Sequence, residues 1–128
     1  MEYPLYKHIY DSALEVHRLL GGPGLLETVY ETALCHELSL RGITSKRQIA
    51  IPVTYKNTVV RDPLYLDILV NNQVIIEVKA NGTNYPFYEV QLGTYLRLTG
   101  VKTGYIINFG KQDIQEGIYR VLNTSLGI

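Results

Sequence analysis

The chain has 128 residues, of which 46% are hydrophobic, and its twelve basic and twelve acidic residues cancel to a formal net charge of zero. This length suits a single hydrophobic core, so we expect residues 1–128 to form one domain. The neutral balance excludes the general attraction to nucleic acid that strongly basic domains exert. The single cysteine, Cys35, excludes an intrachain disulfide and a thiolate zinc cluster.

No apolar run in the sequence approaches the roughly 20 residues that cross a bilayer. The first residues, MEYPLYKHIYDS, lack the basic-then-apolar pattern of a secretion signal. We therefore expect a cytoplasmic protein that makes no contact with a membrane.

Two helices are predicted near the N-terminus. Apolar residues recur at helical spacing from Leu5 to Leu20, and the sequence GGPG at 21–24 then breaks the pattern. A second apolar stripe predicts a helix from about Leu25 to about Leu40, ended at Gly42.

Strand patterns follow. Alternating apolar residues from Ile49 to Tyr55 predict a strand, and Pro52, which cannot donate a ladder hydrogen bond, indicates an edge strand or a bulge. The apolar runs at 64–70 and 74–80, joined by a polar segment, predict a β-hairpin.

The rest of the chain predicts a helix near Tyr88 to Thr99, ended by Gly100, and a strand from Thr103 to Phe109. The tail at 114–122 fits either a short strand or a helical turn. The expected order is therefore α-α-β-β-β-α-β, a mixed α/β fold.

The loop of the hairpin decides whether two acidic residues share a face. A two-residue turn would direct the carboxylates of Asp67 and Glu77 to opposite faces. A three-residue loop at 71–73 pairs Val70 with Val74 and sets Asp67 opposite Glu77. We predict the three-residue loop, or a two-residue turn corrected by one bulge.

Glu77 and Lys79 flank one apolar residue, so their side chains lie on the same face of the strand. Together with Asp67 they provide the oxygen ligands and the cation that phosphodiester hydrolysis needs. Mg²⁺ suits a site with one or two carboxylates and room for water and phosphate oxygens. We expect Asp67, Glu77 and the carbonyl of Val78 to hold Mg²⁺ or Mn²⁺. Lys79, normally protonated, would position the attacking water and screen charge on phosphorus.

Two further motifs lie on the predicted helices. The sequence QLGTY at 91–95 gives Q-x-x-x-Y, whose spacing places Gln91 and Tyr95 on one side of a helix. The neutral amide of Gln91 can hold a water, a carboxylate or a phosphate without adding charge. The sequence GLLETVY at 24–30 gives G-x-x-E-x-x-Y and contains Glu27, which the helix dipole alone would also favour there. We expect Glu31, one turn later, at the surface.

The D…E-x-K pair followed by a Q-x-x-x-Y helix resembles the RecB-like branch of the PD-(D/E)xK nucleases. The segments GPGLLETVYETAL, IPVTYK, IIEVKA, QLGTYLRLTG and GYIINFG, in this order, resemble the GxxExxY protein family, which is grouped with these nucleases. The resemblance spans nearly the whole chain. It implies a restriction-endonuclease-like αβββαβ core with an extra N-terminal helix.

The same resemblance implies a nuclease dependent on Mg²⁺ or Mn²⁺ that acts on nucleic acid, with DNA favoured over RNA. It implies that Glu27 joins the metal site, directly or through water. His17, in the V-H segment before the glycine turn, is either a neighbour of the site or a helix histidine satisfied by packing. Tyr30 and Tyr95 are either site neighbours or core aromatics.

Two other functions remain open. Asp67, Glu77 and Lys79 could form a structural ion-pair cluster in a catalytically silent module for binding or assembly. The chain could also hydrolyse another class of phosphoester. Because it has no appended element for reading DNA, target choice is expected to need a homodimer or a partner protein. The aromatic segment 85–88 could stack bases or seal a subunit contact.

Overall fold

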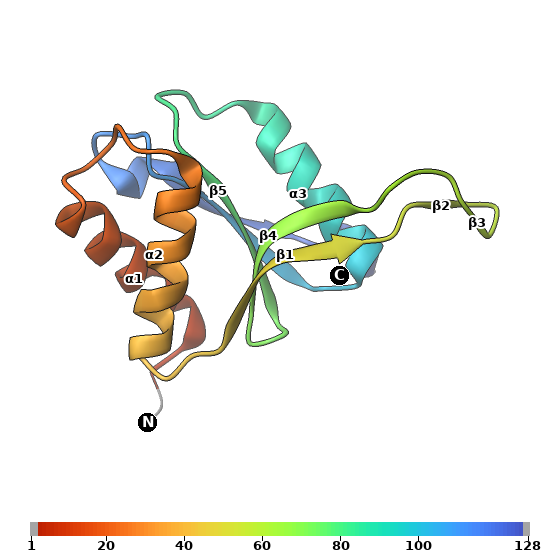
Figure 1. Cartoon of the computed structure of the whole chain (residues 1–128), viewed down its shortest axis with the longest axis horizontal. Helices are drawn as coiled ribbons and strands as arrows, with labels where there is room; N and C mark the ends of the chain where they lie inside the picture. The colour runs from red at the N-terminus through yellow and green to blue at the C-terminus, as the bar shows by residue number, and fades with distance from the viewer. Residues whose placement is uncertain (1–2, 127–128) are drawn as a thin grey trace.

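The computed structural model of the chain describes residues 3–126, with helices on both faces of a twisted sheet (Figure 1). Helices α1 (Leu5–Leu19) and α2 (Glu27–Leu40) pack on one face, and α3 (Pro86–Thr99) covers the other. The sheet has the strand order β1-β4-β5-β6-β7, in which only β5 and β6 run parallel. Its strands are β1 (Ser45–Ile51), β4 (Leu64–Val70), β5 (Val74–Lys79), β6 (Thr103–Asn108) and β7 (Ile118–Leu122).

This architecture confirms the mixed α/β fold expected from the sequence, including the extra N-terminal helix. The helix α3 starts at Pro86, where the missing N–H of proline costs nothing, and ends at Gly100 with a φ of 77°. The tail contains both of its predicted alternatives, a 3₁₀ turn η1 (Ile114–Gly117) and then β7. A second short turn, η2 (Thr124–Leu126), follows.

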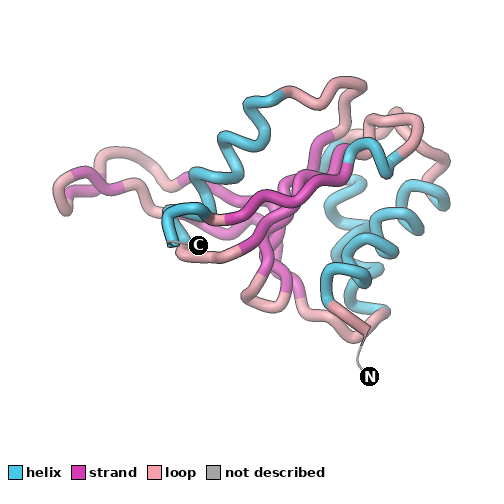
Figure 2. The backbone as a smooth tube through the Cα atoms, turned by 180° about the vertical axis from the view of Figure 1, so that it is seen from behind, coloured by secondary structure: helices cyan, strands magenta, loops and turns pink. Residues whose placement is uncertain are grey.

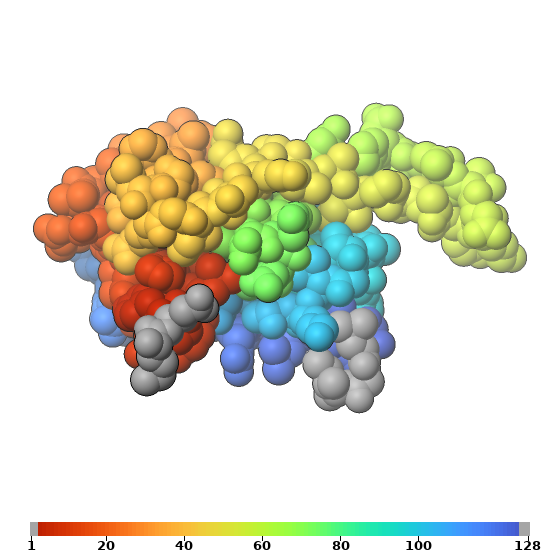
Figure 3. Space-filling model, turned by 90° about the horizontal axis from the view of Figure 1, so that it is seen from below, coloured from red at the N-terminus to blue at the C-terminus, as the bar shows by residue number. Residues whose placement is uncertain are grey.

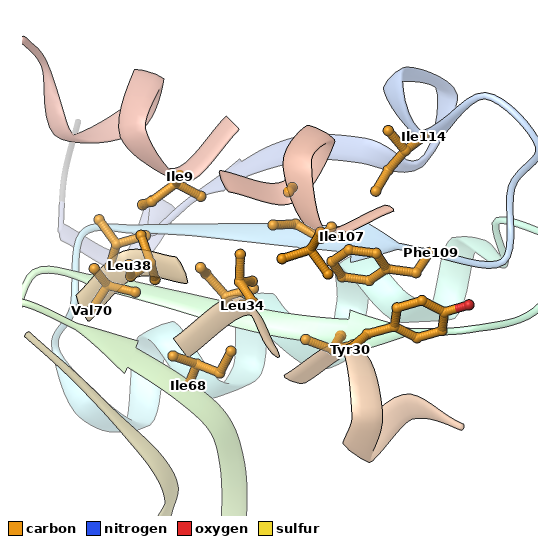
Figure 4. Packing of buried hydrophobic residues seen from close by; sticks show 14 residues of the cluster. Ile9, Tyr30, Leu34, Leu38, Ile68, Val70, Ile107, Phe109 and Ile114 are labelled. Atoms are coloured by element: carbon orange, nitrogen blue, oxygen red, sulfur yellow. The ribbon is translucent and has the colours of Figure 1, made fainter. Parts of the chain in front are cut away.

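Strand β5 lies at the centre of the molecule and is buried on both faces. Val74, Ile76 and Val78 point towards α1 and α2, whereas Ile75 packs with residues of α3. Figure 4 shows the first of these clusters, which joins the sheet to α1 and α2 through Ile9, Tyr30, Leu34, Leu38, Ile68, Val70, Ile107, Phe109 and Ile114. The two clusters hold the sheet rigidly between its helices.

The predicted strand from Ile49 to Tyr55 is wrong in its extent. β1 ends at Ile51, and the chain then forms a separate hairpin of β2 (Thr54–Tyr55) and β3 (Thr58–Val59). Pro52 interrupts the ladder, while positive φ angles at Lys56 and Asn57 close a tight turn. As Pro52 indicated, β1 is an edge strand.

Residues 52–63, which we call the arm, carry this hairpin away from the sheet (Figures 1 and 2). The space-filling view shows the arm extending beyond the rest of the molecule (Figure 3). Each helix within residues 3–126 falls short of the length and apolar character that a membrane crossing requires.

Candidate functional site

The hairpin of β4 and β5 has the three-residue loop expected from the sequence. Its ladder pairs Val70 with Val74, and the loop residues Asn71 and Asn72 adopt left-handed conformations with φ of 52° and 54°. Asparagine tolerates this region better than most residues. The predicted register is therefore confirmed from Val70 and Val74 to Ile68 and Ile76, whereas Asp67 and Glu77 lie beyond the end of the ladder.

Strands β4 and β5 separate at the end of the hairpin that lies away from the loop. The ladder stops at the pair of Ile68 and Ile76. Beyond it, the Asp67 backbone N–H donates to Glu77 Oε2 at 2.8 Å, and the Val78 N–H donates to Asp67 Oδ2 at 2.9 Å. Each carboxylate thus bonds to the backbone where ladder hydrogen bonds are missing, which holds both acids across the gap.

Strand β4 also changes faces at Asp67. Leu66 packs with the α3 cluster and Ile68 with the α1–α2 cluster, although strict alternation would put both on one face. On the neighbouring strand, Gln48 has a φ of 54°, and the β1–β4 ladder skips Gln48 and Asp67 while continuing on either side. This distortion opens the sheet where the acids converge.

The pKa of Glu77 is raised to about 8, mainly by burial and secondly by the negative charge of Asp67. Burial likewise raises the pKa of Asp67, against the opposing hydrogen bond from the Val78 amide. Two acids held together in a poorly hydrated place resist ionising together. A bound cation would relieve that resistance, so the electrostatics fit a metal site.

Lys79 carries the positive charge of the site. Its Nζ donates to Gln91 Oε1 at 3.3 Å and lies 4.7 Å from the centre of the Tyr88 ring. The charge of Lys79 lowers the pKa of both Asp67 and Glu77. The structure therefore brings Gln91 beside Lys79, and it adds a cation–π contact that sequence reasoning missed.

Helix α2 contributes a different acid from the one expected. Glu27 is exposed in the first turn, whereas Glu31 is only 3% exposed, so the prediction of a surface Glu31 is wrong. Glu31 accepts hydrogen bonds from Arg47 Nη2 at 3.0 Å and from Gln48 Nε2 at 2.8 Å. The edge strand β1 supplies both partners, which local sequence patterns do not reveal.

The Gln48 amide also links Glu31 to the site, because its Nε2 lies 3.4 Å from Asp67 Oδ1. The negative charges of Glu31 and, more weakly, Glu27 raise the pKa of Asp67. Glu27 is thus near enough to influence the site electrostatically, while Glu31 is connected to it through hydrogen bonds.

His17 and Tyr30 lie in the packing around the glycine turn. His17 Nε2 contacts the Lys111 carbonyl at 2.9 Å. The Tyr30 hydroxyl donates to the Gly22 carbonyl at 2.7 Å, and its ring stacks on Phe109 at a centroid distance of 4.7 Å. These contacts tie α1 and α2 to the loop after β6, so neither residue needs the carboxylate site to explain its position.

Tyr95 lies closer to the acids. It is 7% exposed and packs between α3 and the sheet. Burial raises the pKa of Tyr95, the charges of Glu77 and Asp67 add to the rise, and a hydrogen bond with Gln91 opposes it. The two ends of the Q-x-x-x-Y motif therefore meet near the site, with Gln91 in contact with Lys79.

Within residues 3–126, no three His, Cys, Asp or Glu side chains gather into a ready metal centre. The site offers two carboxylates, from Asp67 and Glu77, with the Val78 carbonyl in the same segment. This is a donor set that suits Mg²⁺ or Mn²⁺, since Mg²⁺ keeps several waters and binds few protein carboxylates. The residues present fit such an ion.

The site thus lies in a five-stranded mixed sheet whose central hairpin opens at Asp67 and Glu77, with Lys79 beside them. The sequence model of the PD-(D/E)XK nuclease superfamily matches residues 4–121. The chain belongs to this superfamily, whose nucleases generally depend on divalent metal ions. No curated protein sequence matches the chain significantly.

Solved structures share the fold. The crystal structure of SSO0001 aligns with a TM-score of 0.57 at 16% identity, covering 91% of this chain and 57% of that one. An alkaline exonuclease, LHK-Exo, from Laribacter hongkongensis aligns with a TM-score of 0.54 at 16% identity, covering 98% of this chain and 74% of the exonuclease. The chain thus spans little more than half the length of SSO0001.

Proposed function

We propose that the chain is a nuclease that uses Mg²⁺ or Mn²⁺ to hydrolyse phosphodiester bonds, with DNA preferred to RNA. The observation that carries this proposal is the opening between β4 and β5, where Asp67 and Glu77 are held by each other's strand and Lys79 is held by Gln91. Membership of the superfamily and the fold shared with an alkaline exonuclease support it.

The metal would be held by the carboxylates of Asp67 and Glu77 with the Val78 carbonyl, and Glu27 would contribute directly or through water. When bound, a divalent ion supplies positive charge that polarises a phosphoryl oxygen. The raised pKa of Glu77 means that this residue must lose its proton before it can act as an anionic ligand.

The role of Lys79 is electrostatic. Its ammonium group is oriented by Gln91 and by the face of Tyr88. From this position it can hold an attacking water and stabilise negative charge that develops on phosphorus. Gln91 is a positioning residue in this scheme, and its neutral amide orients the lysine without cancelling its charge.

We assign the chain to the GxxExxY family of the RecB-like, Q-x-x-x-Y-bearing branch, as its motifs indicate. Because the net charge is zero, we further propose that target choice depends on a homodimer or on a partner protein. Glu27 of the G-x-x-E-x-x-Y motif is exposed and Glu31 is buried, so mutating each acid separately would show which of them contributes to metal binding.

The decisive test is cleavage of labelled single-stranded and double-stranded DNA, and of RNA, by purified protein with Mn²⁺ or Mg²⁺. Asp67→Asn and Lys79→Ala should each lower the rate by about 10²–10³-fold, as expected for removal of a group that stabilises developing charge. Matched controls are Asp62→Asn and Lys102→Ala, because both residues are exposed and neither contacts the site.

Cleavage that persists equally in both site variants would identify a contaminant and remove the proposal. If no substrate is cleaved and neither ion raises the melting temperature, the silent binding or assembly module becomes the better description. Cleavage of a simple phosphodiester without cleavage of nucleic acid would instead favour another phosphoester substrate.

A further inference from the structure

Two large aromatic side chains stand exposed at the start of α3, just before Tyr88 in the sequence. Tyr85 is 52% exposed and Phe87 is 64% exposed, and we call this pair the aromatic ledge. The Tyr85 ring packs edge-on against Tyr88 at 5.5 Å, and Tyr88 in turn covers the Lys79 ammonium. Phe87 lies one helical turn before Gln91, on the same side of α3. The ledge therefore borders the charged group of the candidate site.

The backbone beneath the ledge is firmly held. Asn108, which is fully buried at the end of β6, accepts hydrogen bonds from the N–H groups of Asn81 and Gly110 at 3.2 and 3.0 Å. Its amide donates to the Thr83 carbonyl at 3.2 Å and to Asn84 Oδ1 at 3.0 Å. One buried side chain thus fixes the loop that leads into α3.

A further contact anchors the ring next to the ledge, since the Asn81 amide donates to the Tyr88 hydroxyl. Because the loop and this ring are already ordered, a ligand that stacks on the ledge would not have to immobilise them. Preorganisation of this kind strengthens binding. Single exposed hydrophobic residues are common and need no explanation, but two exposed rings beside the anchored Tyr88, which covers the site lysine, form a specific surface.

The chemistry around the ledge selects its occupant. Lys79 lies beside Tyr88, and Lys111, from the segment after β6, donates from its Nζ to the Gly82 carbonyl at 3.1 Å in the loop that leads into α3. A flat ring next to ammonium groups matches a nucleotide, in which a flat base is linked to an anionic phosphate. An apolar protein segment would leave these charges unpaired.

We propose that Tyr85 and Phe87 stack unpaired nucleobases of a strand whose phosphate lies at Lys79. The placement of the phosphate rests on the proposed nuclease function. Bases inside a duplex have their faces covered by their neighbours, so the ledge can engage only single-stranded segments or frayed ends. The substrate class is therefore nucleic acid with unpaired bases next to the cleaved bond, without sequence preference, because every base has a flat face.

The test measures binding in EDTA, so that it does not depend on cleavage. Three fluorescently labelled oligonucleotides of 15 nucleotides are compared by fluorescence anisotropy. They are an oligothymidylate, an abasic strand with the same number of phosphates, and a blunt-ended duplex. The wild-type protein should bind the oligothymidylate on the order of tenfold more tightly than the abasic strand. The double variant Tyr85→Ala/Phe87→Ala should lose this preference and keep its affinity for the abasic strand.

The matched control is Tyr6→Ala, because Tyr6 is 55% exposed and lies on α1, on the opposite face of the sheet. A second measurement uses the absence of tryptophan from the chain. Phe87→Trp introduces a single reporter whose fluorescence should be quenched by the oligothymidylate and not by the abasic strand. Tyr6→Trp should respond to neither probe.

Equal affinity of the wild-type protein for the two single strands, or no binding of any probe, would overturn the proposal. So would a base preference that survives in the double variant. If that variant instead converts a dimer into a monomer while the preference persists, the ledge is a subunit contact. If the base preference is absent but nucleic acid is cleaved, only the stacking proposal is overturned. If the base preference is present but nothing is cleaved, only the nuclease proposal is overturned.

Discussion

The two ends of the β4–β5 hairpin are built from the same strands but behave differently. From the loop as far as Ile68 and Ile76, the two strands are paired in the ladder, and these two residues are fully buried. At the other end the ladder stops, and Asp67 and Glu77 accept hydrogen bonds from the separated backbones. The paired end contributes stability through apolar packing. The open end lacks ladder hydrogen bonds and buries two acids, so it contributes less to stability than the paired end. Hydrogen bonds from the backbone to the two carboxylates allow these acids to lie beside a hydrophobic core.

The largest effect should come from pH, because the open end holds a proton that the unfolded chain releases. The pKa of Glu77 is raised from 4.5 to about 8 in the folded protein, and that of Asp67 is also raised. The contribution of these two acids to the free energy of unfolding of the metal-free protein should therefore be largest below about pH 4.5. It should decrease as the pH rises to about 8, because the unfolded chain then releases protons that the folded protein still holds. The loss is at most about 1.4 kcal/mol per pKa unit.

Urea unfolding in EDTA at several pH values measures this loss. Glu77→Gln should flatten most of the decline, whereas Glu89→Gln, at an exposed position, should leave it intact. An unchanged slope in Glu77→Gln would show that the open end does not hold the proton.

Metal binding should have the next largest effect. Because only the folded open end presents both acids, Mn²⁺ at 100 times its dissociation constant should stabilise the protein by about 2.7 kcal/mol. Thermal melts with and without the ion measure the gain. Asp67→Asn should remove most of it and Asp62→Asn should not. An equal gain in both variants would place the ion elsewhere.

Substitution of Arg47 tests whether β1 stabilises the open end through its ion pair with Glu31. Its removal leaves the buried Glu31 without its ion-pair partner, so Arg47→Ala should cost about 1–3 kcal/mol of unfolding free energy. Combining it with Glu31→Gln should recover much of that cost in a double-mutant cycle. Arg97→Ala, on the exposed side of α3, is the control. Simple additivity in the cycle would contradict the pairing.

The smallest effect is expected at the paired end. Ile76→Val removes one methylene from the core and should cost about 0.5–1.5 kcal/mol, measured by urea unfolding. The dependence of stability on pH and on Mn²⁺ should remain as in the wild type. If this substitution weakens the metal effect as strongly as Asp67→Asn does, the two ends of the hairpin are not independent.

Most of the fold follows from local patterns. Helical spacing predicted α1 and α2, and two apolar runs joined by a polar segment predicted the hairpin of β4 and β5. Counting residues in the loop also predicted the register that pairs Val70 with Val74. The limits of local reasoning appear at Pro52, which indicated an edge strand but did not reveal the arm that follows it, and at Glu31, which was expected at the surface.

The sequence by itself determined which strands carry Asp67, Glu77 and Lys79 and that Glu77 and Lys79 share a face, because strand periodicity and loop length act between close neighbours along the chain. Only the tertiary structure decided that β4 and β5 separate at Asp67, that Gln48 and Arg47 reach Glu31, and that Tyr88 covers Lys79. These contacts join residues that are distant in sequence or belong to different elements. They depend on how helices and an edge strand pack against the sheet, which no local pattern encodes.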